Sequence, residues 1–263
     1  MEEEPIIVAI DVGTTKVCTL IGEVDKDGQV CVVGVGVAPS RGLTKGVVVN
    51  VEEATKSIAS SIDKAERISG YRIEAAYLGL AGKHILSVNS KGTVAVGRGE
   101  RYITEDDVAR AIEAAQDLAV QHGREIIHVL PRCYILDGQE GVRDPVGMMG
   151  FRLEAAVHIV TGAVPSIRNL VQCVESSHVT VNELVLQPLA SAEAVLTLEE
   201  RETGVALVDA GGGTTDVAIL AEGAICHSAV LPVGGNNLTN DIAVGLKTPF
   251  EVAEKLKLQY GHA

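Results

Sequence analysis

Short apolar segments that flank polar turns set the pattern of this chain. Val205 to Val208 and Val217 to Leu220 are apolar runs of the length of buried strands, and glycines and threonines separate them. This pattern predicts two strands joined by a tight turn. The same order of an apolar strand, Asp, a small residue, glycine and Thr-Thr stands near the N-terminus, in the segment from Ile6 to Ile21.

Each copy of this pattern continues in the same way. A third extended segment follows, Cys31 to Ala38 in the first copy and Ala224 to Val233 in the second, and a helix-like stretch comes next. The duplication predicts two similar halves whose turns face each other. One copy alone would be a weak signal, because short motifs match by accident. Two copies make a glycine-rich hairpin without a ligand the less favoured interpretation.

Four of the predicted helices frame the elements around these strands. Apolar residues repeat three and four positions apart in the first two, and Asn50, Thr104 and Thr248 stand where a cap is expected. The predicted helices run from Asn50 to Ser69, from Thr104 to Leu118, from Pro165 to Val174 and from Thr248 to Tyr260.

The segment from Lys83 to Gly162 departs from the repeated unit. Ile85 to Val88 and Thr93 to Val96 flank a polar stretch, which predicts a hairpin whose turn is Asn89 to Gly92. Further strands are expected at 125–130, 133–136 and 155–160. We interpret this segment as a small inserted α/β domain, with Met148 and Met149 filling its core rather than forming a contact surface.

Composition narrows the fold and the partners. Apolar residues make up 46% of the chain and aromatic residues 3%, so the cores must consist of Val, Ile, Leu and Ala, as in sheets buried on both faces. A net charge of −13 argues against nucleic acid and against unaided binding to anionic lipid. Since the first residues lack the features of a signal peptide, we expect a cytosolic protein with buried free thiols at its five cysteines.

The repeated turns carry the candidate chemistry. Three successive glycines leave backbone N–H groups uncovered, and a concave set of such groups attracts anions such as phosphate. Thr214 and Thr215 add donors, and Asp209 ends a strand where a hydrated metal can rest. Gln187 lies where a strand becomes a helix at Pro188. Its amide either orients a water for attack on phosphorus or stabilises the start of the helix, and the local sequence does not distinguish these two roles.

Four stretches together resemble the actin/Hsp70/sugar-kinase superfamily and, within it, the FtsA family of bacterial cell-division proteins. Two are typical of the superfamily, and two are more particular to the family. They are Ile10 to Lys16 and Asp209 to Asp216 for the superfamily, and Asp137 to Gly141 with Asp144 to Glu154, and Thr248 to Gly261, for the family.

This resemblance implies a duplicated α/β fold of the actin-like, ribonuclease H-like kind, with a small α/β insertion and an incomplete second half. The first half would comprise 1–82 and 163–190, and the inserted interaction domain, of the SHS2 type, 83–162. The second half would comprise 191–245, and the start of an FtsZ-binding subdomain 246–263.

The resemblance also implies roles for individual residues. Asp11 and Asp209 would hold a hydrated Mg²⁺, and Gln187 would place the attacking water. The residues that would wrap the phosphates of ATP are Gly13, Thr14, Thr15 and Lys16 in the first turn and Gly211, Gly212, Gly213, Thr214 and Thr215 in the second.

Members of this family bind ATP, polymerise at the inner face of the cytoplasmic membrane and recruit FtsZ and other division proteins. By this resemblance we expect slow or absent ATP hydrolysis. We also expect membrane attachment through an amphipathic C-terminal helix that lies beyond Ala263. A small-molecule kinase shares the two turns and is the alternative, although no stretch supplies its carboxylate base. A scaffold that holds nucleotide without turnover is a further alternative, and a chaperone ATPase would carry its insertion elsewhere.

Overall fold

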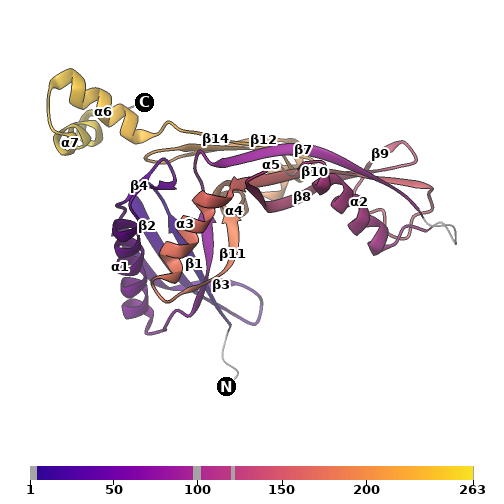
Figure 1. Cartoon of the computed structure of the whole chain (residues 1–263), viewed down its shortest axis with the longest axis horizontal. Coiled ribbons are helices and arrows are strands. Elements are labelled where there is room, and N and C mark those ends of the chain that lie inside the picture. The colour runs from indigo at the N-terminus through magenta and orange to yellow at the C-terminus, as the bar shows by residue number, and fades with distance from the viewer. Residues whose placement is uncertain (1–4, 97–101, 120–121, 263) are drawn as a thin grey trace.

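The computed structural model describes residues 5–96, 102–119 and 122–262. The first sheet has the order β11-β6-β1-β2-β3, in which β1 pairs antiparallel with β2 and parallel with β6. Its helices, α1 and α3, pack on one face and bury a core of valine, isoleucine and leucine (Figure 1). The elements of this half are β1 (Ile6–Val12), β2 (Lys16–Val24), β3 (Val30–Pro39), β4 (Leu43–Thr44), β5 (Val47–Val48), α1 (Val51–Ser69), β6 (Ala75–Leu80), α3 (Val164–Glu175) and β11 (Thr180–Leu186).

Helix α1 shows how the sequence specifies this half. The side chain of Asn50 accepts a hydrogen bond from the backbone N–H of Glu53, and Gly70 ends the helix in the left-handed conformation, as predicted. Gly36 on β3 allows the helix to approach, because an added Cβ would lie 1.8 Å from the carbonyl oxygen of Ser61. The apolar stripe of α1 is therefore pressed directly onto the sheet.

The segment inserted into the first half forms a second sheet, of order β7-β10-β8-β9, with α2 on one face. Its elements are β7 (Ile85–Ala95), α2 (Glu105–Asp117), β8 (Arg124–Leu136), β9 (Gln139–Val142) and β10 (Arg152–Ala163). This second sheet lies beside the first sheet and extends away from it (Figure 1).

The predicted hairpin at Asn89 to Gly92 is wrong, because β7 runs through it without a turn. The polar residues make contacts that a turn would not provide. Ser90 Oγ donates to the carbonyl of Ala115 in α2 at 2.8 Å, and Asn89 Nδ2 donates to the carbonyl of Cys226 at 2.9 Å. At Gly92 a Cβ would lie 2.0 Å from the Ala111 oxygen, so this glycine admits the helix.

Three smaller expectations also need correction. The strands expected at 125–130 and 133–136 form one strand, β8, which continues through Pro131. Among the cysteines only Cys173 is buried, and Cys31 is exposed. Met148 is half-buried against the core of the insertion, as expected, whereas Met149 is 63% exposed and so fills no core.

The second half contains a sheet of order β12-β13-β14, on which α4 and α5 pack. Its elements are α4 (Gln187–Val195), α5 (Leu198–Thr203), β12 (Val205–Ala210), β13 (Thr215–Ala221), β14 (Ala224–Leu231), α6 (Gly235–Leu246) and α7 (Phe250–Tyr260). Helices α6 and α7 pack on each other at one end of the molecule (Figure 1). Pro249, not Thr248, occupies the cap position of α7, and among the described residues no side chain caps that helix.

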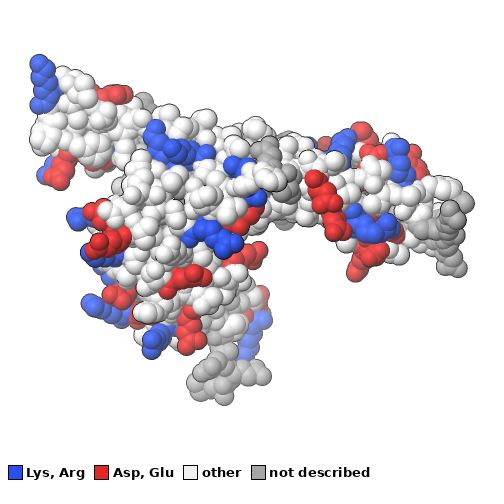
Figure 2. All heavy atoms as spheres, viewed as in Figure 1, with Lys and Arg blue, Asp and Glu red and all other residues white. Residues whose placement is uncertain are grey.

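The surface carries both signs of charge. Figure 2 shows acidic and basic side chains interspersed over the first half and the insertion. Within the described residues no helix is long and apolar enough to cross a membrane.

Candidate functional site

The two glycine-threonine turns have the same construction. The N–H of Gly13 donates to the carbonyl of Lys16 at 3.0 Å, and the N–H of Gly211 donates to the carbonyl of Thr214 at 2.9 Å. Each bond leaves a two-residue tip, 14–15 in the first turn and 212–213 in the second. The first Thr-Thr pair therefore corresponds to two glycines of the second turn, and not to its Thr-Thr pair as the sequence order suggested.

The tips of these turns lie against each other in a reciprocal way. A Cβ on Gly212 would stand 1.9 Å from Oγ1 of Thr15, and a Cβ on Gly213 would stand 2.7 Å from Oγ1 of Thr14. The first tip position of each turn thus meets the second tip position of the other, as in a contact between two-fold related units. The prediction that the two turns face each other is confirmed by this geometry.

Free backbone donors lie at the tips of both turns, where the turns meet. In the described part of the chain, the N–H groups at positions 14, 15, 212 and 213 donate no hydrogen bond to another protein group. Gly213 is buried, and a buried N–H group without a partner is uncommon. Successive free N–H groups in a turn form an anion-binding concavity. This arrangement suits the phosphate groups that the sequence predicted here.

The N-terminus of α6 supports the second turn rather than adding donors to it. The N–H groups of Gly235 and Asn236 donate to the carbonyls of Gly211 and Gly212 at 2.9 and 2.8 Å. Lys257 of α7 in turn donates from Nζ to the carbonyl of Gly235 at 3.2 Å. Helix α6 therefore holds the carbonyl side of the second turn, and α7 contacts the start of α6, while within the described residues the N–H groups at 212 and 213 remain free.

Asp11, Gln187 and Asp209 share one cavity of about 290 Å³ between the halves. Gln187 Nε2 donates to Oδ1 of Asp11, and Ser191 Oγ donates to Oδ2 of Asp209 at 3.2 Å. Burial raises the pKa of Asp11, the charge of Lys16 lowers it, and the charge of Asp209 raises it further. Structure and sequence thus agree in bringing together both carboxylates and the glutamine.

A third carboxylate, that of Asp216, lies beside this cavity. It pairs with Asp209 across β12 and β13 and is 4% exposed. Oδ2 accepts from Thr214 Oγ1 at 3.3 Å, and within the described residues Oδ1 has no hydrogen-bond partner. Burial raises the pKa of Asp216 to about 6, the Thr214 hydrogen bond opposes this, and the charges of Asp209 and Asp11 contribute to it.

Sequence reasoning assigned no role to Asp216 or to Ser191. Counting the hairpin register outward from the turn would have placed Asp216 opposite Asp209, so a signal for it was present. Nothing in the local sequence marks Ser191, because its contact with Asp209 depends on how α4 packs against β12.

The chemistry of these groups fits a hydrated Mg²⁺. Within the described residues no cluster of three or more Asp, Glu, His or Cys side chains forms a protein cage for a metal. Mg²⁺ does not need such a cage, because it keeps several waters and is held by one or two carboxylates together with substrate phosphates. Asp11 and Asp209, beside free N–H groups, supply that kind of environment.

Family models match two parts of the chain, and curated relatives match nearly all of it. The family model described as "SHS2 domain inserted in FTSA" matches residues 82–161, and the one described as "Cell division protein FtsA" matches residues 206–263. Cell division protein FtsA of Pseudomonas aeruginosa is 50% identical over 258 residues, which are 98% of this chain and 61% of that protein. FtsA of Neisseria meningitidis is 42% identical over 262 residues, 100% of this chain and 63% of that protein.

Among solved structures, a PilM-PilN type IV pilus biogenesis complex matches with a TM-score of 0.74 at 14% identity, covering 97% of this chain and 70% of that one. The ethanolamine utilization protein EutJ of Carboxydothermus hydrogenoformans matches with a TM-score of 0.56 at 18% identity. This match covers 97% of this chain and 62% of that one. These matches concern the fold alone. The predicted actin-like α/β fold with an SHS2 insertion is confirmed, and the chain spans about three fifths of the length of the curated relatives it matches.

Proposed function

The chain belongs to the FtsA family of cell-division proteins, and from this premise we propose that it binds ATP with Mg²⁺ where its two turns meet. Asp11 and Asp209 would hold the hydrated cation, and the tip N–H groups and Lys16 would hold the phosphates. Gln187 would place a water beside the terminal phosphate. Each role agrees with the position of the residue in the cavity or the turns.

One observation carries this proposal, the reciprocal contact of two equivalent turns beside a pair of carboxylates. Binding of a polyphosphate requires charge neutralisation and positioning far more than covalent chemistry from the protein. Turns contributed by both halves would grip the phosphates from two sides. A nucleotide bound there would therefore contact both halves and fix their relative position.

The roles of the whole protein are proposed from the family. We propose that it assembles into filaments at the inner face of the cytoplasmic membrane at the division site, and that it connects the FtsZ ring and other division proteins to that surface. The nucleotide would serve assembly, so hydrolysis would be slow or absent. The inserted domain, at 83–162 by our boundaries, would contact neighbouring subunits and division proteins.

Nucleotide titration of the wild type and of Asp209→Ala and Lys16→Ala variants tests the proposal. Each variant removes a charged contact of the kind that contributes about 1.5–3 kcal/mol, so ATP affinity in Mg²⁺ should fall about tenfold to a hundredfold. Lys91→Ala removes an exposed lysine from the insertion, on β7, and serves as the matched control. Equal binding by all four proteins would contradict the site, and phosphorylation of a sugar panel would support the kinase alternative.

A further inference from the structure

Helix α4 contacts both carboxylates of the cavity with one of its faces. Gln187 and Ser191 are four residues apart and so lie on the same side of the helix. Gln187 donates to Asp11 on β1, and Ser191 donates to Asp209 on β12 at 3.2 Å. The two aspartates belong to different sheets, so this helix face connects the two halves at the cavity.

We propose that Ser191 is a positioning residue that holds the Asp209 carboxylate in the orientation required by a hydrated cation, as Gln187 holds Asp11. This inference rests on the proposed Mg²⁺–nucleotide site and adds a residue to it. Ser191 lines the same cavity as both aspartates. It would act through Asp209 and would not itself contact the cation.

The chemistry of the serine hydroxyl suits this role. Asp209 is exposed, so its carboxylate would otherwise rotate among several orientations. A hydroxyl that donates to Oδ2 fixes the group and leaves Oδ1 open to a cation-bound water. Because serine is neutral, the hydrogen bond leaves the negative charge of Asp209 to the cation, whereas a lysine in its place would neutralise that charge.

The packing of α4 makes the position of Ser191 well defined. The neighbouring Ala192 is 1% exposed and packs with Ala218 and Leu220 of β13. The helix also begins directly at the end of β11, since Gln187 follows Leu186. Helix α4 is therefore held against the second sheet by packing, and it continues directly from a strand of the first sheet. Both constraints fix the position of Ser191, as expected of a group that orients a ligand.

The test measures the Mg²⁺ concentration that gives half-maximal binding of a fluorescent ATP analogue, with a parallel titration in EDTA. Ser191→Ala should raise that concentration about tenfold, the lower end of the range for groups that orient metal ligands. Its nucleotide affinity in EDTA should not change. Ser191→Thr keeps the hydroxyl and should stay near the wild-type value. Ser177→Ala, which removes a serine hydroxyl from a hydrogen bond after α3, is the control.

The outcomes separate the inference from the proposed function. If the wild type requires Mg²⁺ and Ser191→Ala has the same requirement, the positioning role is wrong while the nucleotide site stands. An equal loss in Mg²⁺ and in EDTA would also overturn it, because the serine would then only support the fold. If the wild type binds the nucleotide equally well with and without Mg²⁺, both the proposed Mg²⁺–nucleotide site and the positioning role of Ser191 are wrong. Folding should survive the change, since alanine is a better helix former than serine.

Discussion

At the scale of single residues, the two turns show why glycine is needed on only one side of the contact. Threonines form the tip of the first turn, and their side chains occupy the space that side chains of the second tip would require. Gly212 and Gly213 are therefore explained by their neighbours, since neither has the positive φ that favours glycine. The constraint is the close approach of the Thr14 and Thr15 side chains to the backbone of the second turn.

Gly212→Ala tests this constraint. The added Cβ would stand 1.9 Å from Oγ1 of Thr15, so the Thr15 side chain or the turn itself must shift, and we expect the phosphate donors to lose their arrangement. We expect ATP affinity to fall about tenfold or more, as for loss of a charge-assisted hydrogen bond. Gly245→Ala is the matched control, because a Cβ there meets no atom within 4 Å and alanine favours the α6 helix. Unchanged affinity in Gly212→Ala would show that the turn contact is dispensable.

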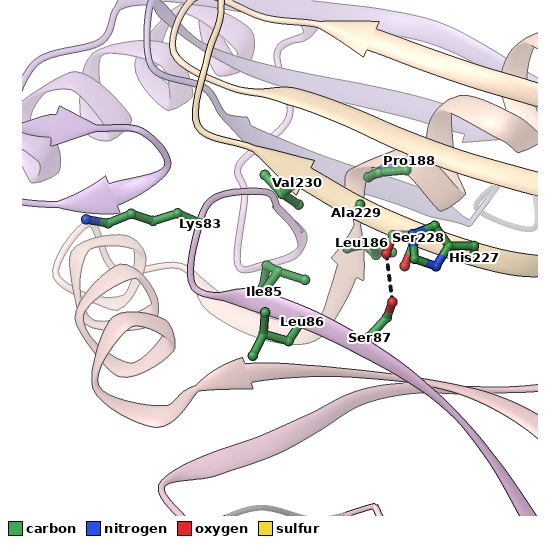
Figure 3. A pocket seen from close by; sticks show the side chains of 10 residues that line it. All are labelled: Lys83, Ile85, Leu86, Ser87, Leu186, Pro188, His227, Ser228, Ala229 and Val230. Carbon is green, nitrogen blue, oxygen red and sulfur yellow. Dashed lines mark hydrogen bonds between the residues drawn. The ribbon is translucent and has the colours of Figure 1, made fainter.

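At the scale of elements, a polar seam joins the insertion to the second half. Ser87 Oγ on β7 donates to the carbonyl of Ser228 at 2.7 Å, and the buried His158 on β10 bonds Asn89 and the Ser228 hydroxyl at 2.7 and 2.9 Å. Figure 3 shows Ser87 and Ser228 facing each other beside a pocket of about 260 Å³ that Leu186 also lines. Side chains, rather than a strand ladder, thus connect β7 to β14.

This seam should weaken in acid. Burial lowers the pKa of His158 to about 4, and the charges of His227 and Arg132 contribute. Unfolding exposes a histidine of ordinary pKa, so the unfolded chain binds more protons between pH 6.5 and 4. Stability is therefore full above this window and falls as the pH drops through it, by about 2 kcal/mol at pH 5 for this histidine.

Urea unfolding at pH 7 and pH 5 measures this effect. His158→Gln keeps groups that can bond Asn89 and Ser228 but does not titrate, so its loss of stability between the two pH values should be smaller. His122→Gln changes an exposed histidine and should behave like the wild type. If His158→Gln and the wild type lose equal stability, His158 does not account for the acid sensitivity of the seam.

The elements also show how far the sequence predicts this structure. The duplicated strands, the helix caps at Asn50 and Thr104 and the helix start at Gln187 follow from local patterns and are confirmed. The hairpin in β7 was wrong because Asn89 and Gly92 resemble turn residues but serve contacts with other elements. Ser191 was missed for the same physical reason, since packing between distant segments decides its contact.

At the scale of the whole molecule, the insertion is attached to the first half by two segments of the chain, one at its start and one at its end. Arg124 connects these two segments by hydrogen bonds. Its Nη2 donates to the carbonyls of His84 and Thr161, both at 2.8 Å, and Nε donates to the hydroxyl of Thr161 at 2.9 Å. Ile85 pairs with Gly162, so the chain leaves and re-enters the first half at neighbouring points. This arrangement suits a module that presents an interaction surface.

Removal of residues 83–162, with the ends rejoined, tests the role of the insertion. Since both turns and the cavity with Asp11 and Asp209 lie outside the insertion, we expect nucleotide affinity to remain. Loss of the seam with β14 should lower stability. Assembly, followed by sedimentation with nucleotide, should be lost. Simultaneous loss of nucleotide binding and assembly would indicate that the insertion supports the fold instead.

The central claim is that a hydrated cation and the phosphates of ATP lie where the two turns and the two carboxylates meet. A crystal structure with an ATP analogue and Mn²⁺, located by its anomalous scattering, tests this most directly. We expect a cation beside Asp11 and Asp209, with the terminal phosphates against the tips at 14–15 and 212–213. A cation or phosphates bound away from these residues would contradict it.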